Sequence, residues 1–155
     1  MVSYSGPWKE EELVTFLTES TFPIRIGVHR QDGSMWIVPL WYRYLEGRFE
    51  CATSVSSDLV RFLEHDPNVA LDISTNHPPY RGVRGRGESS LAFDEEKETL
   101  HSLIERYLGS TDSSLADWLL DEGREEIRIR IRPRELHSWD YTDRMQTIET
   151  VQNRG

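Results

Sequence analysis

The sequence predicts a mainly β fold of the α+β class, with antiparallel strands and a few covering helices. Short runs of apolar and β-branched residues follow one another, separated by turn residues such as the Asp32-Gly33 pair. One run, 126–132, alternates between isoleucine and charged side chains, which is typical of a half-buried strand. Apolar residues recur at helical spacing only in short segments. At 155 residues the chain fits a single domain, 1–155, large enough to bury a core.

The first half of the chain predicts one helix and three strands. Pro7 and the acidic residues after it favour a helix start, and we expect the helix over about 8–19. Strands are expected at 24–29 and 35–44, on either side of the Asp-Gly turn, and at 49–52 after a second turn. The short loops between these strands predict a three-stranded antiparallel meander.

The second half predicts further short helices and strands. The helices carry capping residues at their starts or Gly and Pro at their ends, and the strands are β-branched or alternate in polarity. The expected helices are 56–66, 94–108 and 114–120, and the expected strands are 69–73, 80–93, 126–132 and 135–140. A helical segment, 94–122, is thus inserted before the last strands. The polar tail, 145–155, is expected to be flexible.

Charge and hydropathy exclude several classes of function. The chain carries 27 acidic and 18 basic side chains, and its formal net charge is −9. This charge argues against a nucleic-acid partner, because duplex binding depends on cationic contacts to phosphate. No apolar run is long enough for a membrane helix and no signal peptide is visible, so we expect no membrane partner and a cytoplasmic location. Only two of the bases are lysines, which fits a saline habitat and an arginine-rich genome equally well.

No catalytic residue and no metal site can be nominated. The five histidines and the single cysteine lack the spacing of metal ligands. Cys51 has no basic neighbour to activate it, so we expect a buried structural thiol. The glycine-rich run 82–87 matches no phosphate-binding fingerprint and predicts a curved strand, with glycines where backbones approach closely.

Hydroxyl and aromatic residues suggest a binding site where a strand meets a helix. Thr53, Ser54 and Ser57 precede the start of a predicted helix, where hydroxyls and backbone N–H groups can hold an anion. Trp41 and Tyr42 on the preceding strand could flank a planar ring. A capped turn beside core aromatics explains the same residues, and the pattern alone leaves both interpretations open.

Two groups of arginines lie on predicted strands. Arg81, Arg84 and Arg86 fall within six residues and could hold an anionic group. The arginines of 126–132 form a ladder on one strand face, and we expect the acidic helix 94–108 to supply their partners.

The order of these pieces resembles the pyridoxamine 5′-phosphate oxidase-like family, the FMN-binding split barrels. The resemblance runs from about Phe22 to Tyr141. It is carried by Ile-Val-Pro-Leu-Trp-Tyr at 37–42, Ala-Thr-Ser at 52–54, His-Asp-Pro at 65–67, Val-Arg-Gly-Arg-Gly at 83–87, Glu-Arg-Tyr-Leu-Gly at 105–109, Ile-Arg-Ile-Arg-Pro at 129–133 and Ser-Trp-Asp at 138–140. The resemblance implies an antiparallel split β-barrel with covering helices, assembled as a homodimer.

The resemblance also implies a cofactor and its contacts. Family members hold two FMN molecules at the dimer interface, with the phosphate near the strand-to-helix turn and the ring against the Val-Pro strand. Carried over to this chain, the residues expected to bind are Val38, Pro39, Leu40 and Trp41 at the ring, Thr53, Ser54 and Ser57 at the phosphate, and Trp139 reaching the cofactor from the partner subunit.

This chain departs from the family at the phosphate. Many members have a lysine in the helix after the Thr-Ser turn, where this chain has Leu59 or, one residue earlier, Asp58. A phosphate would lose a charge-assisted contact of about 1.5–3 kcal/mol. Arg61, or Arg84 and Arg86, could replace that contact.

The resemblance implies an FMN-dependent oxidoreductase that acts on a small organic substrate. The pyridoxamine phosphate oxidase reaction itself is not expected, because its basic substrate-phosphate signature is not recognisable. Two alternatives use the same fold: a reductase dependent on the deazaflavin coenzyme, and a cofactor-binding protein without turnover. In each of them the chemistry belongs to the cofactor, while the protein supplies orientation and electrostatics.

Overall fold

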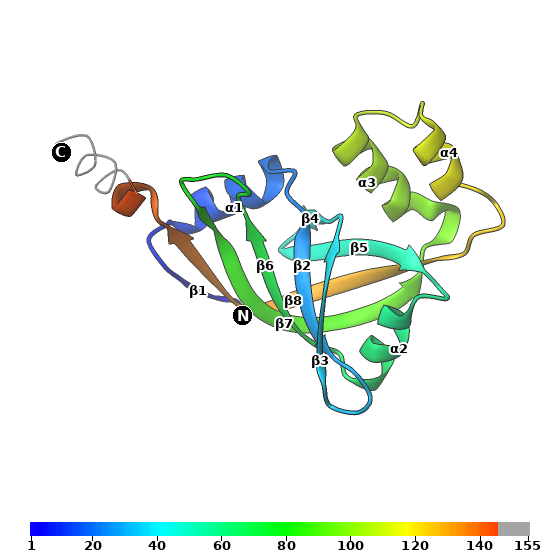
Figure 1. Ribbon diagram of the computed structural model, residues 1–155, viewed down its shortest axis with the longest axis horizontal. Helices are drawn as coiled ribbons and strands as arrows, with labels where there is room; N and C mark the ends of the chain where they lie inside the picture. The colour runs from blue at the N-terminus through cyan, green and yellow to red at the C-terminus, as the bar shows by residue number, and fades with distance from the viewer. Residues whose placement is uncertain (146–155) are drawn as a thin grey trace.

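The computed structural model describes residues 1–145, and it confirms the predicted mainly β fold with a few helices (Figure 1). The strands are β1 Ser3–Ser5, β2 Ile24–His29, β3 Met35–Leu40, β4 Arg43–Leu45, β5 Arg48–Ser54, β6 Asn68–Ser74, β7 Arg81–Phe93 and β8 Glu126–Asp140. The helices are α1 Glu10–Glu19, α2 Asp58–His65, η1 Glu95–Lys97, α3 Glu98–Leu108 and α4 Ser114–Leu119. The predicted tail lies outside the described residues, apart from Met145.

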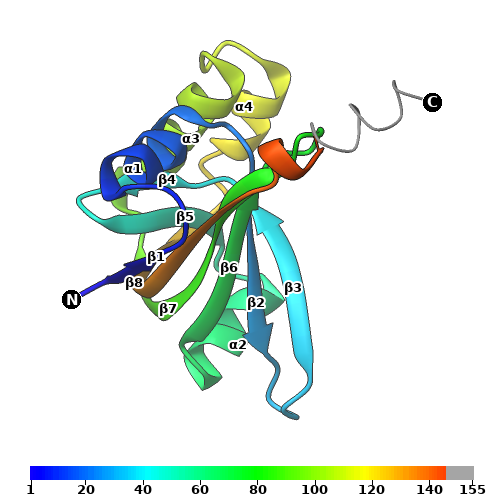
Figure 2. The ribbon, with the colours of Figure 1, turned by 90° about the vertical axis from the view of Figure 1, so that its left-hand side faces the viewer.

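The strands form one sheet that curves into a split barrel (Figures 1 and 2). The hydrogen-bonded order is β3-β2-β6-β7-β8-β5-β4, with every neighbour antiparallel, and β1 adds to β8 in parallel. β3 and β4 lie at opposite ends of this order, yet only Trp41 and Tyr42 join them. Because a link of two residues spans at most about 10 Å, the two ends of the sheet must lie close together.

The predicted three-stranded meander is therefore wrong. β2 and β3 form one hairpin and β4 and β5 another, and the two hairpins occupy opposite ends of the sheet order. The predicted strand 35–44 breaks at Tyr42, whose ring is fully buried and whose hydroxyl donates to the Leu17 carbonyl at 2.8 Å. The backbone N–H of Tyr42 bonds the Tyr107 hydroxyl at 3.2 Å instead of a neighbouring strand. These contacts carry the chain from one hairpin to the other.

β8 is one long strand where two were predicted. It pairs with β7 on one side and with β5 and β1 on the other. Pro133 falls where the β7–β8 register skips Arg134 between the pairs Gly87–Pro133 and Arg86–Glu135. Such an irregularity accommodates a residue that has no N–H to donate.

Alternating side chains of the strands fill the barrel interior. The buried set includes Cys51, as expected, and burial raises the pKa of its thiol. The other interior residues contributed by β2, β5, β6 and β8 are Ile24, Ile26, Val28, Phe49, Val69, Leu71, Ile73, Ile127, Ile129, Ile131 and Leu136.

The arginine ladder pairs mainly with a strand, which corrects the expected pairing with the acidic helix. Glu50 of β5 is buried and accepts hydrogen bonds from Arg130 at 2.8 and 3.0 Å and from Arg43 at 2.9 Å. Arg128 lies 3.8 Å from the same carboxylate. The helix contributes Glu98, which binds Arg43 through two bonds of 2.9 Å.

The connection between β7 and β8, residues 94–125, forms the predicted helical segment on one side of the barrel (Figure 1). Its first helix begins at Glu98 after a kink, because the Asp94 carboxylate accepts the backbone N–H groups of Thr99 and Leu100 at 3.0 Å each. The Asp94 N–H bonds the Glu126 carbonyl at 2.9 Å, so the segment leaves and rejoins the barrel at one place. None of the helices in residues 1–145 is long and apolar enough to cross a membrane.

Candidate functional site

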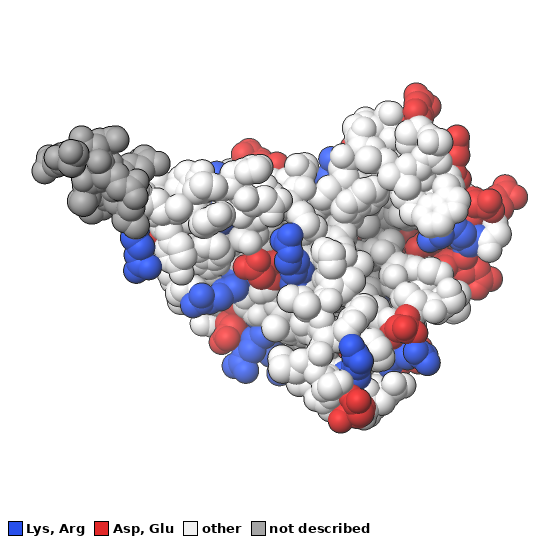
Figure 3. Space-filling view, viewed as in Figure 1, with Lys and Arg blue, Asp and Glu red and all other residues white. Residues whose placement is uncertain are grey.

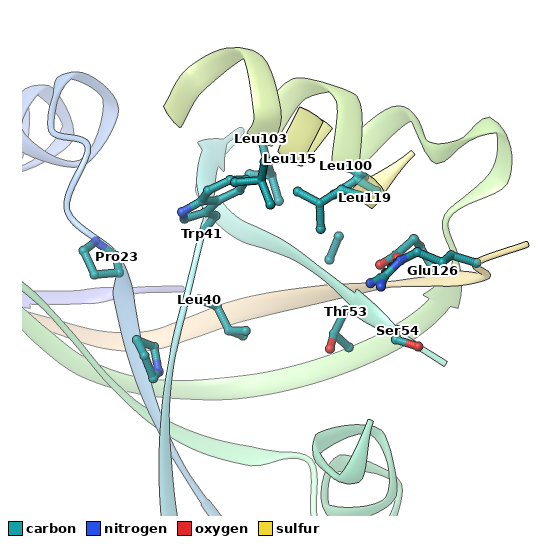
Figure 4. A pocket seen from close by; sticks show the side chains of 13 residues that line it. Pro23, Leu40, Trp41, Thr53, Ser54, Leu100, Leu103, Leu115, Leu119 and Glu126 are labelled. Atoms are coloured by element: carbon teal, nitrogen blue, oxygen red, sulfur yellow. Dashed lines mark hydrogen bonds and ion pairs between the residues drawn. The ribbon is translucent and has the colours of Figure 1, made fainter. Parts of the chain in front are cut away.

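A cavity of about 510 Å³ lies between the barrel and the helical segment (Figure 4). Cavities of roughly 300–1,000 Å³ with mostly apolar walls and a few polar groups are typical of small-molecule sites. The lining residues are Pro23, Pro39, Leu40, Trp41, Ala52, Thr53, Ser54, Leu100, Leu103, Leu115, Leu119, Arg124 and Glu126.

The barrel wall of this cavity is formed by the ends of two strands. Pro39 and Leu40 close β3, Trp41 follows it, and Thr53 and Ser54 close β5. These five residues were predicted to bind the cofactor, and the fold places them around one space although β3 and β5 are not neighbours in the sheet order.

Trp41 is held in place by an aromatic partner. Its ring stacks on Tyr107 of α3, with the centroids 5.1 Å apart and the planes 6° from parallel. The Tyr107 hydroxyl donates to the Phe22 carbonyl at 3.0 Å, which fixes the ring pair between the helix and the chain before β2. This stacking rigidifies one wall of the cavity.

The helical wall is apolar and was not predicted as part of the site. Leu100 and Leu103 project from α3, and Leu115 and Leu119 from α4, toward the barrel residues (Figure 4). Leu100 and Leu103 lie at helical spacing within the predicted helix 94–108, and both are buried. Periodicity identifies the face of a helix that is covered, but it does not distinguish a packed core from the wall of a cavity.

The polar end of the cavity is formed by two further residues that sequence reasoning missed, Arg124 and Glu126. Their closest atoms, Arg124 Nη2 and Glu126 Oε1, are 3.3 Å apart. Glu126 is paired with Ser54 across the β5–β8 ladder, and its side chain is only 2% exposed. Burial raises the pKa of the Glu126 carboxyl and outweighs the opposite effect of Arg124. Neither residue stands out in the sequence, because Arg124 lies in the connection between α4 and β8 and Glu126 is one charged residue of an alternating strand.

The other predicted site residues do not line this cavity. Val38 packs against the barrel core, and Arg84 and Arg86 are exposed on β7, where Arg86 pairs with Glu135 at 3.1 Å. Trp139 is half-buried at the far end of β8, and its indole N–H is buried without a hydrogen-bond partner among residues 1–145. The Ser57 hydroxyl, just before α2, is likewise buried and has no partner in the described part of the chain.

Comparison with known proteins identifies the fold. The chain is 25% identical to the conserved hypothetical protein Rv2991 from Mycobacterium tuberculosis, covering 87% of this chain and 86% of that one with a TM-score of 0.70. It is 20% identical to an F420 reductase (84% and 97% covered, TM-score 0.65) and 13% identical to a candidate pyridoxamine 5′-phosphate oxidase from Listeria innocua (83% and 96% covered, TM-score 0.63). The chain has the pyridoxamine 5′-phosphate oxidase-like split-barrel fold. No protein-family model and no curated protein sequence matches it.

The position where many split-barrel proteins carry a lysine is apolar here. Leu59 is only 3% exposed and belongs to the barrel core, so it offers nothing to an anion. Asp58 is exposed and binds Arg61 at 2.5 Å. A phosphate in this split barrel must therefore find its cation elsewhere.

The residues present nevertheless fit a flavin-type group. Apolar side chains and the fixed Trp41 ring suit a planar ring system, while the Thr53 and Ser54 hydroxyls and the Arg124 guanidinium suit a phosphate. The Ser57 hydroxyl, to which none of the described residues is hydrogen-bonded, follows Thr53 and Ser54 just before α2. In residues 1–145 no group of three or more His, Cys, Asp or Glu side chains could hold a metal ion.

Proposed function

We propose that this chain binds a flavin-type cofactor, FMN in the first place, in the cavity between the barrel and the helical segment, and uses it to oxidise or reduce a small organic molecule. The proposal is carried by one observation: the same cavity has an apolar, aromatic wall and a polar end formed by hydroxyls and a guanidinium. When bound, the cofactor supplies the electron or hydride transfer.

The chain's own residues would bind, orient and exclude water. Pro39, Leu40 and Trp41 would contact the ring, and Thr53 and Ser54 would donate hydrogen bonds to the phosphate. The leucines of α3 and α4 line the opposite side and would exclude water from the bound ring, which would strengthen the polar interactions inside the site. The single buried cysteine suits a reducing compartment, and we propose a cytoplasmic location.

We also propose that two chains associate as a homodimer through the outer face of β2, β3 and β6. On this face Met35 is 76% and Ile37 is 66% exposed. Gly27 and Ala70 lie side by side on the neighbouring strands and line a hollow beside Met35 and Ile37. Exposed apolar side chains around a hollow are typical of a protein interface. Trp139 would reach the cofactor of the other subunit.

Absorbance and fluorescence spectra of the purified protein, followed by titration with FMN, test the proposal. The double variant Thr53→Ala/Ser54→Ala is expected to weaken FMN binding about tenfold or more, because two hydrogen bonds to a charged group are lost. Ser90→Ala, an exposed hydroxyl on β7, is the matched control and should bind as the wild type does. A protein that neither FMN nor a deazaflavin stabilises against heat would contradict the proposal.

A deazaflavin is the second candidate cofactor, because a protein described as an F420 reductase shares the fold over 84% of this chain. Parallel titrations with FMN and the deazaflavin rank the two by affinity. Turnover with NAD(P)H or the reduced deazaflavin then separates an enzyme from a cofactor-binding protein. The apolar Leu59, at the position where many split-barrel proteins carry a lysine, favours a cofactor-binding protein without turnover.

A further inference from the structure

The phosphate of the proposed cofactor needs a cation, and the arginines suggested by the sequence do not line the cavity. Arg61 is 61% exposed and bound to Asp58 at 2.5 Å. Arg86 is 67% exposed and paired with Glu135. Among the described residues that line the cavity, Arg124 is the one cation.

Arg124 is fixed in place by three contacts. Its backbone N–H bonds the Asp121 carbonyl at 3.0 Å, its guanidinium carbon lies 4.3 Å from the centre of the Trp118 ring, and its Nη2 lies 3.3 Å from Glu126. Its side chain is 28% exposed, so it is partly dehydrated but still reachable. Because Glu126 pairs with Ser54, the guanidinium is anchored at the end of the cavity that carries the hydroxyls.

Resting on the proposed function, we infer that Arg124 is the phosphate-binding cation of this chain and that Glu126 is its protonatable counter-ion. In the free protein the Glu126 carboxylate pairs with Arg124. A bound phosphate takes over the guanidinium, and Glu126 then takes up a proton instead of remaining as an unpaired buried anion.

The surroundings of Glu126 favour this exchange. Its side chain is almost fully buried, and burial raises the pKa of its carboxyl. Arg124 and Lys97 favour the charged form, whereas Asp94 opposes it. Glu126 also lines a second cavity. The remaining titratable groups of that cavity are Glu96, His101, Glu122 and Glu125, and three of these four are acidic. Removing Arg124 from the pair by binding it to phosphate therefore shifts Glu126 toward its neutral form.

The first experiment compares cofactors with and without phosphate. Arg124→Gln is expected to lower the affinity for FMN about 10- to 100-fold, measured by flavin fluorescence, while affinity for riboflavin stays unchanged. Arg124→Lys should retain part of the preference for FMN, and Arg61→Gln should retain all of it. Thermal unfolding of each variant identifies any that fails to fold, and Arg124→Lys then carries the test.

The outcomes separate the two proposals. A wild-type protein that binds neither FMN nor a deazaflavin would overturn the proposed function and this inference together. Wild-type binding of FMN with an undiminished affinity in both Arg124 variants would overturn this inference alone.

The second experiment tests the proton. From pH 5 to pH 8 the wild-type affinity for FMN should fall relative to that of Glu126→Gln, because binding takes up a proton only when Glu126 is present. The phosphate itself titrates near pH 6 in both proteins, so the ratio of the two affinities isolates Glu126. Parallel pH profiles would show that Glu126 is not the counter-ion.

Discussion

Glu50 shows how one buried charge organises its surroundings. Its side chain is 3% exposed and is bound by Arg43 and Arg130, while Arg43 also reaches Glu98 on α3. Burial alone would raise the pKa of this carboxyl, but hydrogen bonds from the two arginines outweigh it and hold the pKa below its ordinary value. The carboxylate therefore joins β4, β5 and β8 to the start of the helical segment.

Glu50→Gln is expected to lower the free energy of unfolding by about 2 kcal/mol at pH 7. This is less than for fully buried pairs, because the arginines are partly exposed. A group with a depressed pKa stabilises the fold above its unfolded pKa, near 4.5, and loses that effect as pH falls through the folded value. Urea unfolding at pH 7 and pH 3 should show the difference between wild type and variant shrinking in acid.

Glu98→Gln serves as the control, because Glu98 binds the same Arg43 but is 64% exposed. Its effect should stay below about 1 kcal/mol. Equal losses for the two variants would contradict the role given to Glu50.

At the scale of the elements, the glycines of β7 allow two strands to approach closely. A Cβ atom added at Gly85 would lie 2.2 Å from the carbonyl oxygen of Glu135 on β8, which is backbone and cannot move aside. A Cβ added at Gly27 on β2 would meet nothing nearer than the Ala70 Cβ at 3.8 Å. The sequence predicted close backbone approach for the first of these glycines, and the structure confirms it.

Gly85→Ala is expected to cost about 3 kcal/mol of stability, because the strand pair must separate or distort. Gly27→Ala should change stability by less than about 1 kcal/mol in either direction, since an ordinary strand conformation accepts alanine. Chemical denaturation of both variants checks the contrast. Equal destabilisation by the two substitutions would refute the packing argument.

Most of the strand segments could be predicted because each carries its own alternation or β-branched run, as β2 and the first half of β8 do. Their order could not, since the step from β3 to β4 is decided by where the Tyr42 ring is buried and not by any local pattern. The strand residues of the cavity wall were expected from the family resemblance. The helical wall was not expected, because helical spacing does not distinguish a packed core from the wall of a cavity. Arg124 and Glu126 join Thr53 and Ser54 only through the β5–β8 pairing, which local sequence does not reveal.

For the whole molecule, the proposed dimer makes a direct prediction about mass. Light scattering after size-exclusion chromatography should give twice the mass of one chain for the wild type. Ile37→Glu should shift the protein toward the mass of one chain, because a charge would be buried in the interface. Leu45→Glu, at an apolar side chain that is 48% exposed on β4, should leave the dimer intact. A wild type with the mass of one chain would rule out the interface.

The net charge is distributed unevenly over the molecule. Residues 94–126 contain eleven acids and three bases, so nearly all of the formal −9 lies there. On the face shown in Figure 3, acidic side chains gather at the end that carries the α4–β8 connection. The barrel itself is close to neutral, and the only base between α4 and β8 is Arg124. In the proposed site an anionic ligand would thus meet one cation among the described lining residues, Arg124, in acidic surroundings.

The helical segment leaves β7 and enters β8 side by side, with Phe93 paired to Ile127 and the Asp94 N–H bonded to the Glu126 carbonyl. An insertion with adjoining ends can be exchanged as a cassette without shifting the strands that receive it. Because α3 and α4 supply four of the thirteen residues that line the cavity, such exchange would change the shape of the cavity while the strand residues stay constant. Replacing this one contiguous stretch of chain would therefore alter the proposed ligand site and leave the strands of the barrel unchanged.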